Sequence, residues 1–233
     1  AAVIRTPAGE TVLDFGQNIS GVVEVTVDAQ PGQRILLRHA EVLDRNGNFY
    51  TKNLRTARAE DIFICTGGKE IFRPEFTYHG FRYVAVEGMG ENPDPAAFTA
   101  CVMHSDLKKT AEFTCSNEMV NRLWDNINWG MRDNFVDIPT DCPQRDERLG
   151  WTGDAAVFSP TAAQLYDTYA FFRKWLADLA SEQSVRFGLP DTIPNILMPP
   201  ETPSGGSAVW GDACTLVPWA QYMYSGDSGI LKD

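Results

Sequence analysis

The chain has 233 residues, of which 43% are hydrophobic and 22% charged, and it is long enough for one large domain or two smaller ones. Its net charge of −11 would repel phosphate backbones, so nucleic acid is not expected as a partner, although many acidic proteins use such charge only for solubility. No apolar run approaches the ~20 residues of a membrane helix, and no membrane partner is expected.

The N-terminus and the cysteines bear on cellular location. Ala1–Arg5 shows no basic segment followed by an apolar one, so no secretion signal is expected, and the location is taken as cytoplasmic or open. The five cysteines are widely spaced and form no C-x-x-C pair, which argues against a zinc site or a disulfide framework. We therefore expect buried free thiols in a reducing compartment.

The first hundred residues have the pattern of β-structure. Gly21–Asp28 alternates apolar and polar residues and puts three valines on one face of a strand. Turn signals such as Pro31-Gly32 and Asn46-Gly47 separate it from the strands that follow. Those further strands are expected at 34–39, 61–65, 82–87 and 98–103. Short strands with frequent turns predict an antiparallel sandwich.

After Ser105 the apolar spacing becomes helical. Ser116 is placed to cap a helix with an apolar stripe that runs from Met119 to Met131. Further helices are expected at about 154–166, 168–180 and 212–224, with Pro160 and Pro218 as possible kinks. A long Pro/Gly-rich loop, 187–206, precedes the last of them and is of the kind that is functional or disordered. Asp191 and Glu201 lie in this loop, where they could border a cleft.

The order of strands followed by helices predicts either two domains or an α+β arrangement. We place the boundary at residue 105, with a β-sandwich domain at 1–105 and a helical domain at 106–233. The helical part could belong to a barrel of helical hairpins, but about four helices cannot close one. The chain is therefore expected to be truncated.

The densest chemical signal is the segment Asp137–Asp154, which lies between the first two predicted helices. It contains five carboxylates, two arginines and a tryptophan. Carboxylates and arginines can bind the hydroxyls of a neutral sugar, and tryptophan can stack on its apolar ring face. Glycoside hydrolysis also needs two carboxyl groups in different environments, one of which keeps its proton.

Other interpretations of this segment remain open. A mixed-charge loop between helices is often a solvated network of salt bridges, and its aspartates can cap helices. A calcium site is less favoured, because the D-x-D-x-D-G spacing is missing. His39, His79 and His104 have no cysteine or carboxylate at ligand spacing and are interpreted as structural, so no metal ligand is assigned.

Asp141–Asp154, with the sequence DCPQRDERLGWTGD, closely resembles the signature of bacterial α-L-rhamnosidases, family 78 of the glycoside hydrolases. The resemblance extends to Leu13–Gly21 and Phe76–Tyr83, which resemble strands of that family's β-sandwich. It also includes Val209–Ala213, which resembles a tryptophan-containing helix start in its catalytic domain. It thus covers essentially the whole chain.

The resemblance implies an antiparallel β-sandwich followed by the N-terminal part of an (α/α)6 six-hairpin barrel, and hydrolysis of terminal α-L-rhamnosyl groups with inversion. It assigns Glu147 as general acid. It also assigns five residues to substrate binding: Asp141, Arg145, Trp151, Asp154 and Trp210. Asp146 receives no role beyond a local structural one. The implied partner is a rhamnose-containing glycoside or oligosaccharide, no cofactor is required, and the oligomeric state is open.

The resemblance also places the general base far downstream of this chain, in a part of the barrel that it does not contain. An inverting enzyme needs a second carboxylate across the scissile bond, so the chain alone is expected to be inactive. Two other functions remain as alternatives. One is a polysaccharide lyase on a related barrel, which the lack of histidine after His104 disfavours. The other is a non-catalytic carbohydrate-binding protein.

Overall fold

The computed structural model describes residues 1–183, 188–197 and 206–232. The chain folds into two compact units. The sandwich unit comprises Ala1–His104 together with Pro143–Glu147, and the helical unit comprises Ser105–Cys142 and Arg148–Asp233. The chain therefore leaves the helical unit for five residues in the middle of the motif segment and then returns to it.

The sandwich unit is built on a seven-stranded antiparallel sheet in the order β1-β2-β8-β3-β6, with β7 and β9 also paired to β2. Two short strands, β4 and β5, form a separate hairpin. The strands are β1 (Ala2–Arg5), β2 (Thr11–Ala29), β3 (Arg34–Ala40), β4 (Val42–Leu43), β5 (Phe49–Tyr50), β6 (Glu60–Ile64), β7 (Gly68–Phe72), β8 (His79–Glu87) and β9 (Phe98–Val102). Single-turn helices are η1 (Lys52–Leu54) and η2 (Pro95–Ala97). The predicted β-structure is confirmed.

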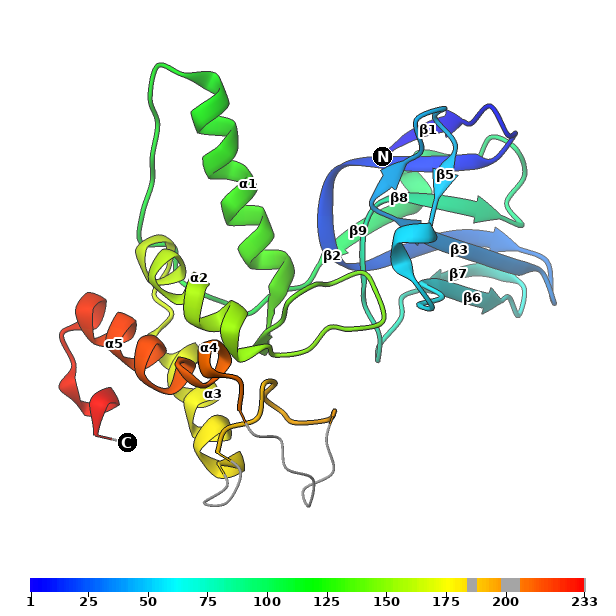
Figure 1. The fold of residues 1–233 in the computed structure, drawn as a ribbon. Coiled ribbons are helices and arrows are strands. Elements are labelled where there is room, and N and C mark those ends of the chain that lie inside the picture. The colour runs from blue at the N-terminus through cyan, green and yellow to red at the C-terminus, as the bar shows by residue number, and fades with distance from the viewer. Residues whose placement is uncertain (184–187, 198–205, 233) are drawn as a thin grey trace. The chain divides into compact units, whose positions relative to one another are not determined.

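Strand β2 is far longer than the predicted strand Gly21–Asp28 and organises the whole sheet. Its first half pairs with β1 and β8, and its second half, from Gly21 onward, pairs with β9 and β7. The register against β8 shifts between Asp14 and Ile19, and Figure 1 shows the strand curving strongly along its length. The three valines Val23, Val25 and Val27 are buried, as the alternation predicts.

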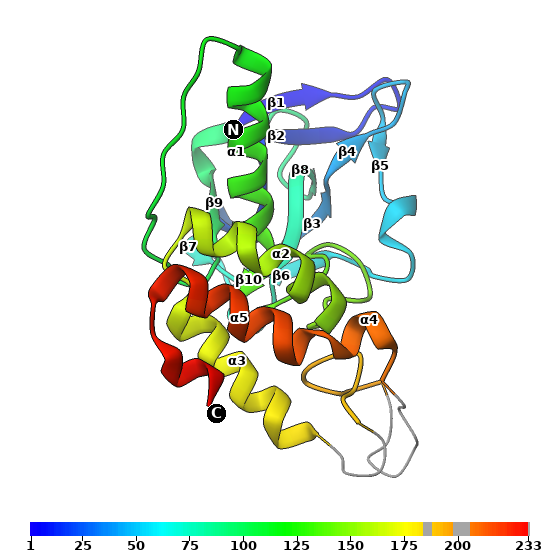
Figure 2. The same ribbon diagram turned by 60° about the vertical axis from the view of Figure 1, so that its left-hand side comes forward.

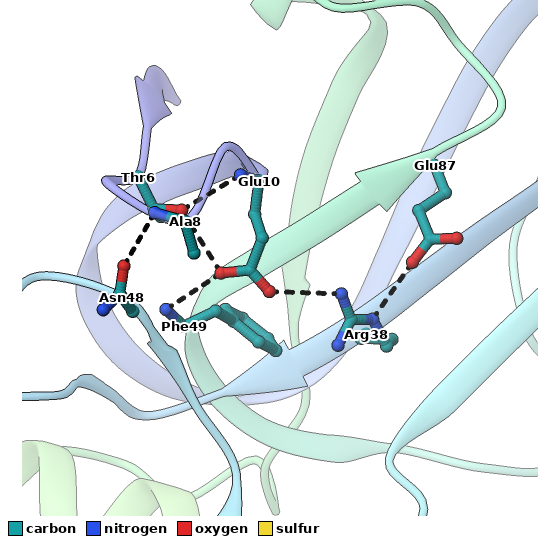
Figure 3. Close-up of polar contacts among 7 residues, drawn as sticks. All are labelled: Thr6, Ala8, Glu10, Arg38, Asn48, Phe49 and Glu87. Atoms are coloured by element: carbon teal, nitrogen blue, oxygen red, sulfur yellow. Dashed lines mark hydrogen bonds and ion pairs between the residues drawn. The ribbon is translucent and has the colours of Figure 1, made fainter.

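A polar network ties the N-terminal turn of this unit to its neighbours (Figure 3). The carboxylate of Glu10 accepts hydrogen bonds from the Phe49 N–H at 3.2 Å and from Arg38 Nη2 at 3.4 Å. Arg38 also forms an ion pair with Glu87, with 3.3 Å between Nε and Oε1. Asn48 accepts a hydrogen bond from the Ala8 N–H at 2.9 Å. These contacts join β3, β5 and β8 to the turn before β2.

The helical unit contains α1 (Glu118–Asn134), α2 (Thr152–Leu165), α3 (Tyr169–Glu182), α4 (Ala208–Gly211), α5 (Ala213–Ser225) and the single turn η3 (Ser228–Leu231). Between α1 and α2 lies a hairpin of β10 (Phe135–Val136) and β11 (Ile138–Pro139). Helix α5 packs against α2 and α3, and Figures 1 and 2 show these three helices together. Their core includes Phe135, Phe172, Trp175, Leu179 and Val217.

The prolines and the first helix differ from expectation in part. Pro160 and Pro218 lie inside α2 and α5, each of which continues as one element. The predicted cap of α1, Ser116, is wrong: the side chain of Asn117 accepts from the N–H groups of Met119 and Val120. The stripe is buried only toward its end, since Met119, Val120 and Leu123 are exposed and Met131 is buried.

None of the helices in the described residues is long and apolar enough to cross a membrane. All five cysteines lie in the described part of the chain and are free thiols. Cys65 and Cys142 are buried as expected, whereas Cys101 and Cys115 are half-buried and Cys214 is exposed, so the expectation of burial is wrong for these three.

Candidate active site

The motif segment begins on a framework fixed by backbone hydrogen bonds in the helical unit. Thr140 donates through both its N–H and its hydroxyl to the carbonyl of Asn134, the last residue of α1, at 2.9 and 2.8 Å. Asp141 then pairs with Leu149 twice: its N–H donates to the Leu149 carbonyl, and its carboxylate accepts from the Leu149 N–H, both at 3.0 Å. These bonds close the base of a loop and hold the Asp141 carboxylate at its edge.

Glu147, the predicted acid, lies in the part of the loop that groups with the sandwich unit. Its Oε2 accepts from Arg145 Nε at 3.0 Å, and Arg145 Nη2 lies 2.9 Å from the same oxygen. Arg55 Nη1 donates to Oε2 as well, at 3.1 Å. The Glu147 side chain is 20% exposed. The carboxylate is therefore oriented by two guanidinium groups that share one of its oxygens.

Two further acidic residues of the sandwich unit accept hydrogen bonds from polar side chains. Asp146 accepts a hydrogen bond from the hydroxyl of Thr56, which holds the pKa of the Asp146 carboxyl below its usual range. Glu41 accepts from Asn18 at 3.1 Å. Burial raises the pKa of Glu41, while the Asn18 hydrogen bond and the nearby charge of Arg145 act in the opposite direction. Asp146 thus has a specific partner, which the sequence did not indicate.

Three of the other predicted residues line a cavity of about 590 Å³ in the helical unit. Asp141 and Asp154 line it together with the indole of Trp210. Asp154 lies in the first turn of α2, and Trp210 lies in α4. The remaining wall is largely apolar and includes Ile127, Met131, Phe135, Val157 and Phe158. Apolar walls with a few convergent carboxylates are typical of small-molecule sites.

The two tryptophans are set against each other at this cavity. Their rings meet edge to face, with 6.5 Å between the centroids of Trp151 and Trp210. Gly153 makes room for Trp210, because a Cβ at this position would lie 3.1 Å from the indole nitrogen. Trp151 itself is not among the residues lining the cavity. The structure thus brings Asp141, Asp154 and Trp210 to one cavity, with Trp151 against Trp210, and pairs Arg145 with Glu147 in the sandwich unit.

The long loop before α4 is only partly described. Asp191 accepts hydrogen bonds from the Ser207 N–H and hydroxyl, at 3.1 and 3.0 Å, and its backbone carbonyl accepts from the Thr152 N–H at 2.9 Å. It therefore connects this loop to the start of α2 rather than lining the cavity. Glu201, the other residue considered for the cleft border, lies outside the described residues.

A separate buried cluster in the sandwich unit has metal-ligating side chains. Asp61 Oδ1 lies 3.1 Å from His79 Nε2, and Asp61 Oδ2 lies 3.7 Å from His39 Nε2. The spacing of these residues in the sequence did not indicate that they are close. The two imidazole rings stack at 4.1 Å with an interplanar angle of 23°. Ring nitrogens bind metals in the plane of the ring, and two nearly parallel planes do not converge on one ion. The donor types fit a metal but their arrangement does not, which favours a structural role.

Comparison with known proteins matches both units to domains of the same protein family. Residues 4–104 match the family model described as the bacterial α-L-rhamnosidase concanavalin-like domain. Residues 108–233 match the model of the bacterial α-L-rhamnosidase 6 hairpin glycosidase domain. The chain is 46% identical over 232 residues to an α-L-rhamnosidase of Streptomyces avermitilis, and these residues are 99% of this chain and 22% of that protein.

Solved structures give the same result. A crystal structure of Streptomyces avermitilis α-L-rhamnosidase complexed with L-rhamnose superposes with a TM-score of 0.92 at 45% identity, covering 99% of this chain and 22% of that one. Native α-L-rhamnosidase from Aspergillus terreus gives a TM-score of 0.92 at 48% identity, covering 100% of this chain and 27% of that one. The chain thus spans about a quarter of the length of these relatives.

Proposed function

Because the chain belongs to the bacterial α-L-rhamnosidase family, we propose that the longer protein of which it forms a part hydrolyses terminal α-L-rhamnosyl groups of rhamnosides. The observation that carries this proposal is the cavity lined by Asp141, Asp154 and Trp210. Two carboxylates can accept hydrogen bonds from sugar hydroxyls, and the indole and apolar wall suit the less polar face and the methyl group of rhamnose. The solved relative with bound L-rhamnose supports the choice of sugar.

In the proposed mechanism Glu147 is the general acid of an inverting hydrolysis. Its proton passes to the glycosidic oxygen as the bond between that oxygen and the sugar C1 breaks, and water adds to C1 from the opposite face. Asp141, Arg145, Asp154, Trp151 and Trp210 bind the sugar. The carboxylate that takes the proton from water lies outside this chain, roughly 6.5–9.5 Å from the acid in such enzymes. The 233-residue chain alone is therefore expected to have no turnover.

Release of the aryl group from aryl glycosides tests this function. The longer protein is expected to cleave an aryl α-L-rhamnoside and to leave a panel of other aryl glycosides intact, whereas the 233-residue chain cleaves none. Cleavage of a different sugar would refute the proposed specificity. Turnover by the short chain would refute the placement of the base outside it.

Replacing Glu147 by Gln in the longer protein tests the role of the acid. The amide cannot supply the proton, so kcat on a substrate with a poor leaving group should fall by roughly 10²–10⁴-fold, the usual range for general acid catalysis. A leaving group that departs without protonation should be affected much less. Glu112→Gln is the matched control, since Glu112 is an exposed carboxylate of the helical unit that pairs with Lys109 at 3.7 Å. Equal losses with both leaving groups would contradict the assignment.

A further inference from the structure

The segment that carries Glu147 groups with the sandwich unit. No motif in the segment indicates this. Three residues that are far from this segment in the sequence contact it. Arg55 reaches Glu147, the Thr56 hydroxyl donates to Asp146, and Gly80 lies against Pro143 and Gln144. The sandwich unit thus supplies the surroundings of the proposed general acid.

Among these contacts, Arg55 is the one that reaches the reacting group. It follows the turn η1, whose Leu54 is 1% exposed and so fixes the chain just before Arg55. The Arg55 backbone has φ 58° and ψ −115°. This conformation is costly for a residue with a Cβ and is one that glycine would adopt more easily. Strained backbone held in place by its surroundings is typical of functional positions.

We propose that Arg55 is a positioning residue for Glu147 in glycoside hydrolysis, an inference that rests on the function proposed above. Arg145 lies only two residues from Glu147, and Arg55 directly follows η1 in the sandwich unit; both contact the carboxylate through Oε2. Contacts from two directions to one oxygen restrict rotation of the carboxyl group more than either would alone. An acid that must reach a glycosidic oxygen within hydrogen-bond distance depends on such orientation.

Arg55 also matters for the charge that the reaction creates. When Glu147 has given its proton to the leaving oxygen, its carboxyl group becomes an anion. The guanidinium groups of Arg55 and Arg145 already lie within 3.1 Å of that anion's Oε2. In the enzyme form in which Glu147 holds its proton, charged groups already placed where the negative charge develops stabilise the transition state without reorganisation. The benefit should be greatest for substrates whose leaving group needs the proton.

The test uses Arg55→Ala and Arg55→Lys in the longer protein, with aryl α-L-rhamnosides of poor and good leaving groups. For Arg55→Ala, kcat on the poor leaving group should fall by roughly tenfold or more, as expected for a misoriented catalytic group. KM and the rate on the good leaving group should change little, and Arg55→Lys should restore part of kcat. The Arg55 side chain is 55% exposed, so its removal should leave the melting temperature nearly unchanged.

Two comparisons separate positioning from general effects. Arg58→Ala removes an exposed positive charge three residues away and should leave kcat unchanged. Adding Arg55→Ala to Glu147→Gln should cause no further loss, because the group through which Arg55 acts is already gone. An Arg55→Ala protein that behaves like Arg58→Ala, or that loses activity equally in the Glu147→Gln background, overturns the inference alone. A wild-type protein that cleaves no aryl α-L-rhamnoside overturns the proposed function and the inference with it.

Discussion

At the scale of single residues, the protonation of His39 is controlled by its burial in the sandwich unit. The side chain has no exposed surface, and its Nδ1 lies 2.9 Å from the carbonyl of Ala59. Burial, with a smaller contribution from His79, lowers the pKa of His39 from 6.5 to about 3, although Ala59 and Asp61 act in the opposite direction. The imidazole is therefore neutral in the folded protein at neutral and mildly acidic pH.

The low pKa of His39 predicts acid sensitivity of the sandwich unit. The unfolded chain takes up a proton below pH 6.5, whereas the folded chain does so only near pH 3, so stability is complete above 6.5 and falls as the pH drops between these values. From pH 8 to pH 5 the loss should be about 2 kcal/mol. Hydrogen exchange of β3 and β8 amides, corrected for intrinsic exchange rates, measures this loss of stability for the sandwich unit alone.

The variant His39→Gln removes the titrating group. It should lower stability at pH 8 but should abolish most of the difference between pH 8 and pH 5. His104→Gln, which replaces an exposed histidine of the same unit, should keep the wild-type difference. A wild-type pH difference that persists in His39→Gln would show that another group is responsible.

The candidate site was predictable at residue scale only where its members belong to short sequence motifs, such as Asp141–Asp154 and the segment Val209–Ala213 that contains Trp210. Asp141, Glu147 and Asp154 belong to one continuous motif, so their residue types and spacing could be recognised together. Arg55 and Thr56 lie 92 and 90 residues from their partners, and an arginine or threonine beside a turn has no distinctive pattern. The roles assigned to the motif residues stay predictions until activity is measured.

At the scale of elements, the start of α1 shows how two neighbouring residues with similar cap propensity are told apart. Ser116 and Asn117 are both good N-cap residues, and apolar periodicity does not fix a helix start to one position. Asn117 Oδ1 accepts from the N–H groups of Met119 and Val120 at 3.0 and 3.4 Å. Its backbone is extended, with φ −100° and ψ 109°, as an N-cap requires.

This cap gives a matched pair of variants. Asn117→Ala leaves two N–H groups of the first turn without their acceptor and should lower the free energy of unfolding by about 1 kcal/mol. Ser116→Ala should change it by less than about 0.5 kcal/mol, as is usual for exposed positions. Denaturant unfolding followed by tryptophan fluorescence suits the test, because all six tryptophans lie at or beyond residue 124, in the helical unit. Equal effects of the two substitutions would contradict the cap assignment.

Element boundaries were predictable where one period runs unbroken. Helix α3 was expected at 168–180 and is found at Tyr169–Glu182, with Phe172, Trp175 and Leu179 buried along one face. Strand β2 was expected to begin at Gly21, yet it starts at Thr11. The register shift between Asp14 and Ile19, with Gly16 at φ 79°, breaks the alternation that would reveal its first half.

At the scale of the whole molecule, the two units have different roles although the chain passes between them more than once. The helical unit provides a cavity, and the sandwich unit holds the five residues Pro143–Glu147. Two glycines of the sandwich unit allow the packing within its sheet to be tested separately from its contact with this loop. A Cβ at Gly21 would lie 2.1 Å from the backbone oxygen of Cys101, inside the sheet, whereas a Cβ at Gly80 would lie 2.9 Å from side-chain atoms of Pro143 and Gln144.

Substitution by alanine should therefore have different effects on stability and turnover at these two positions. Gly21→Ala must part β2 from β9, so it should cost roughly 1–3 kcal/mol of stability, as overpacking does, and lower the melting temperature. Gly80→Ala has only the loop to displace, so the melting temperature should change little. Turnover of aryl α-L-rhamnoside by the longer protein should nevertheless fall several-fold, because Glu147 moves with the loop. Unchanged turnover in a folded Gly80→Ala protein would show that the loop keeps its position without the close contact to β8.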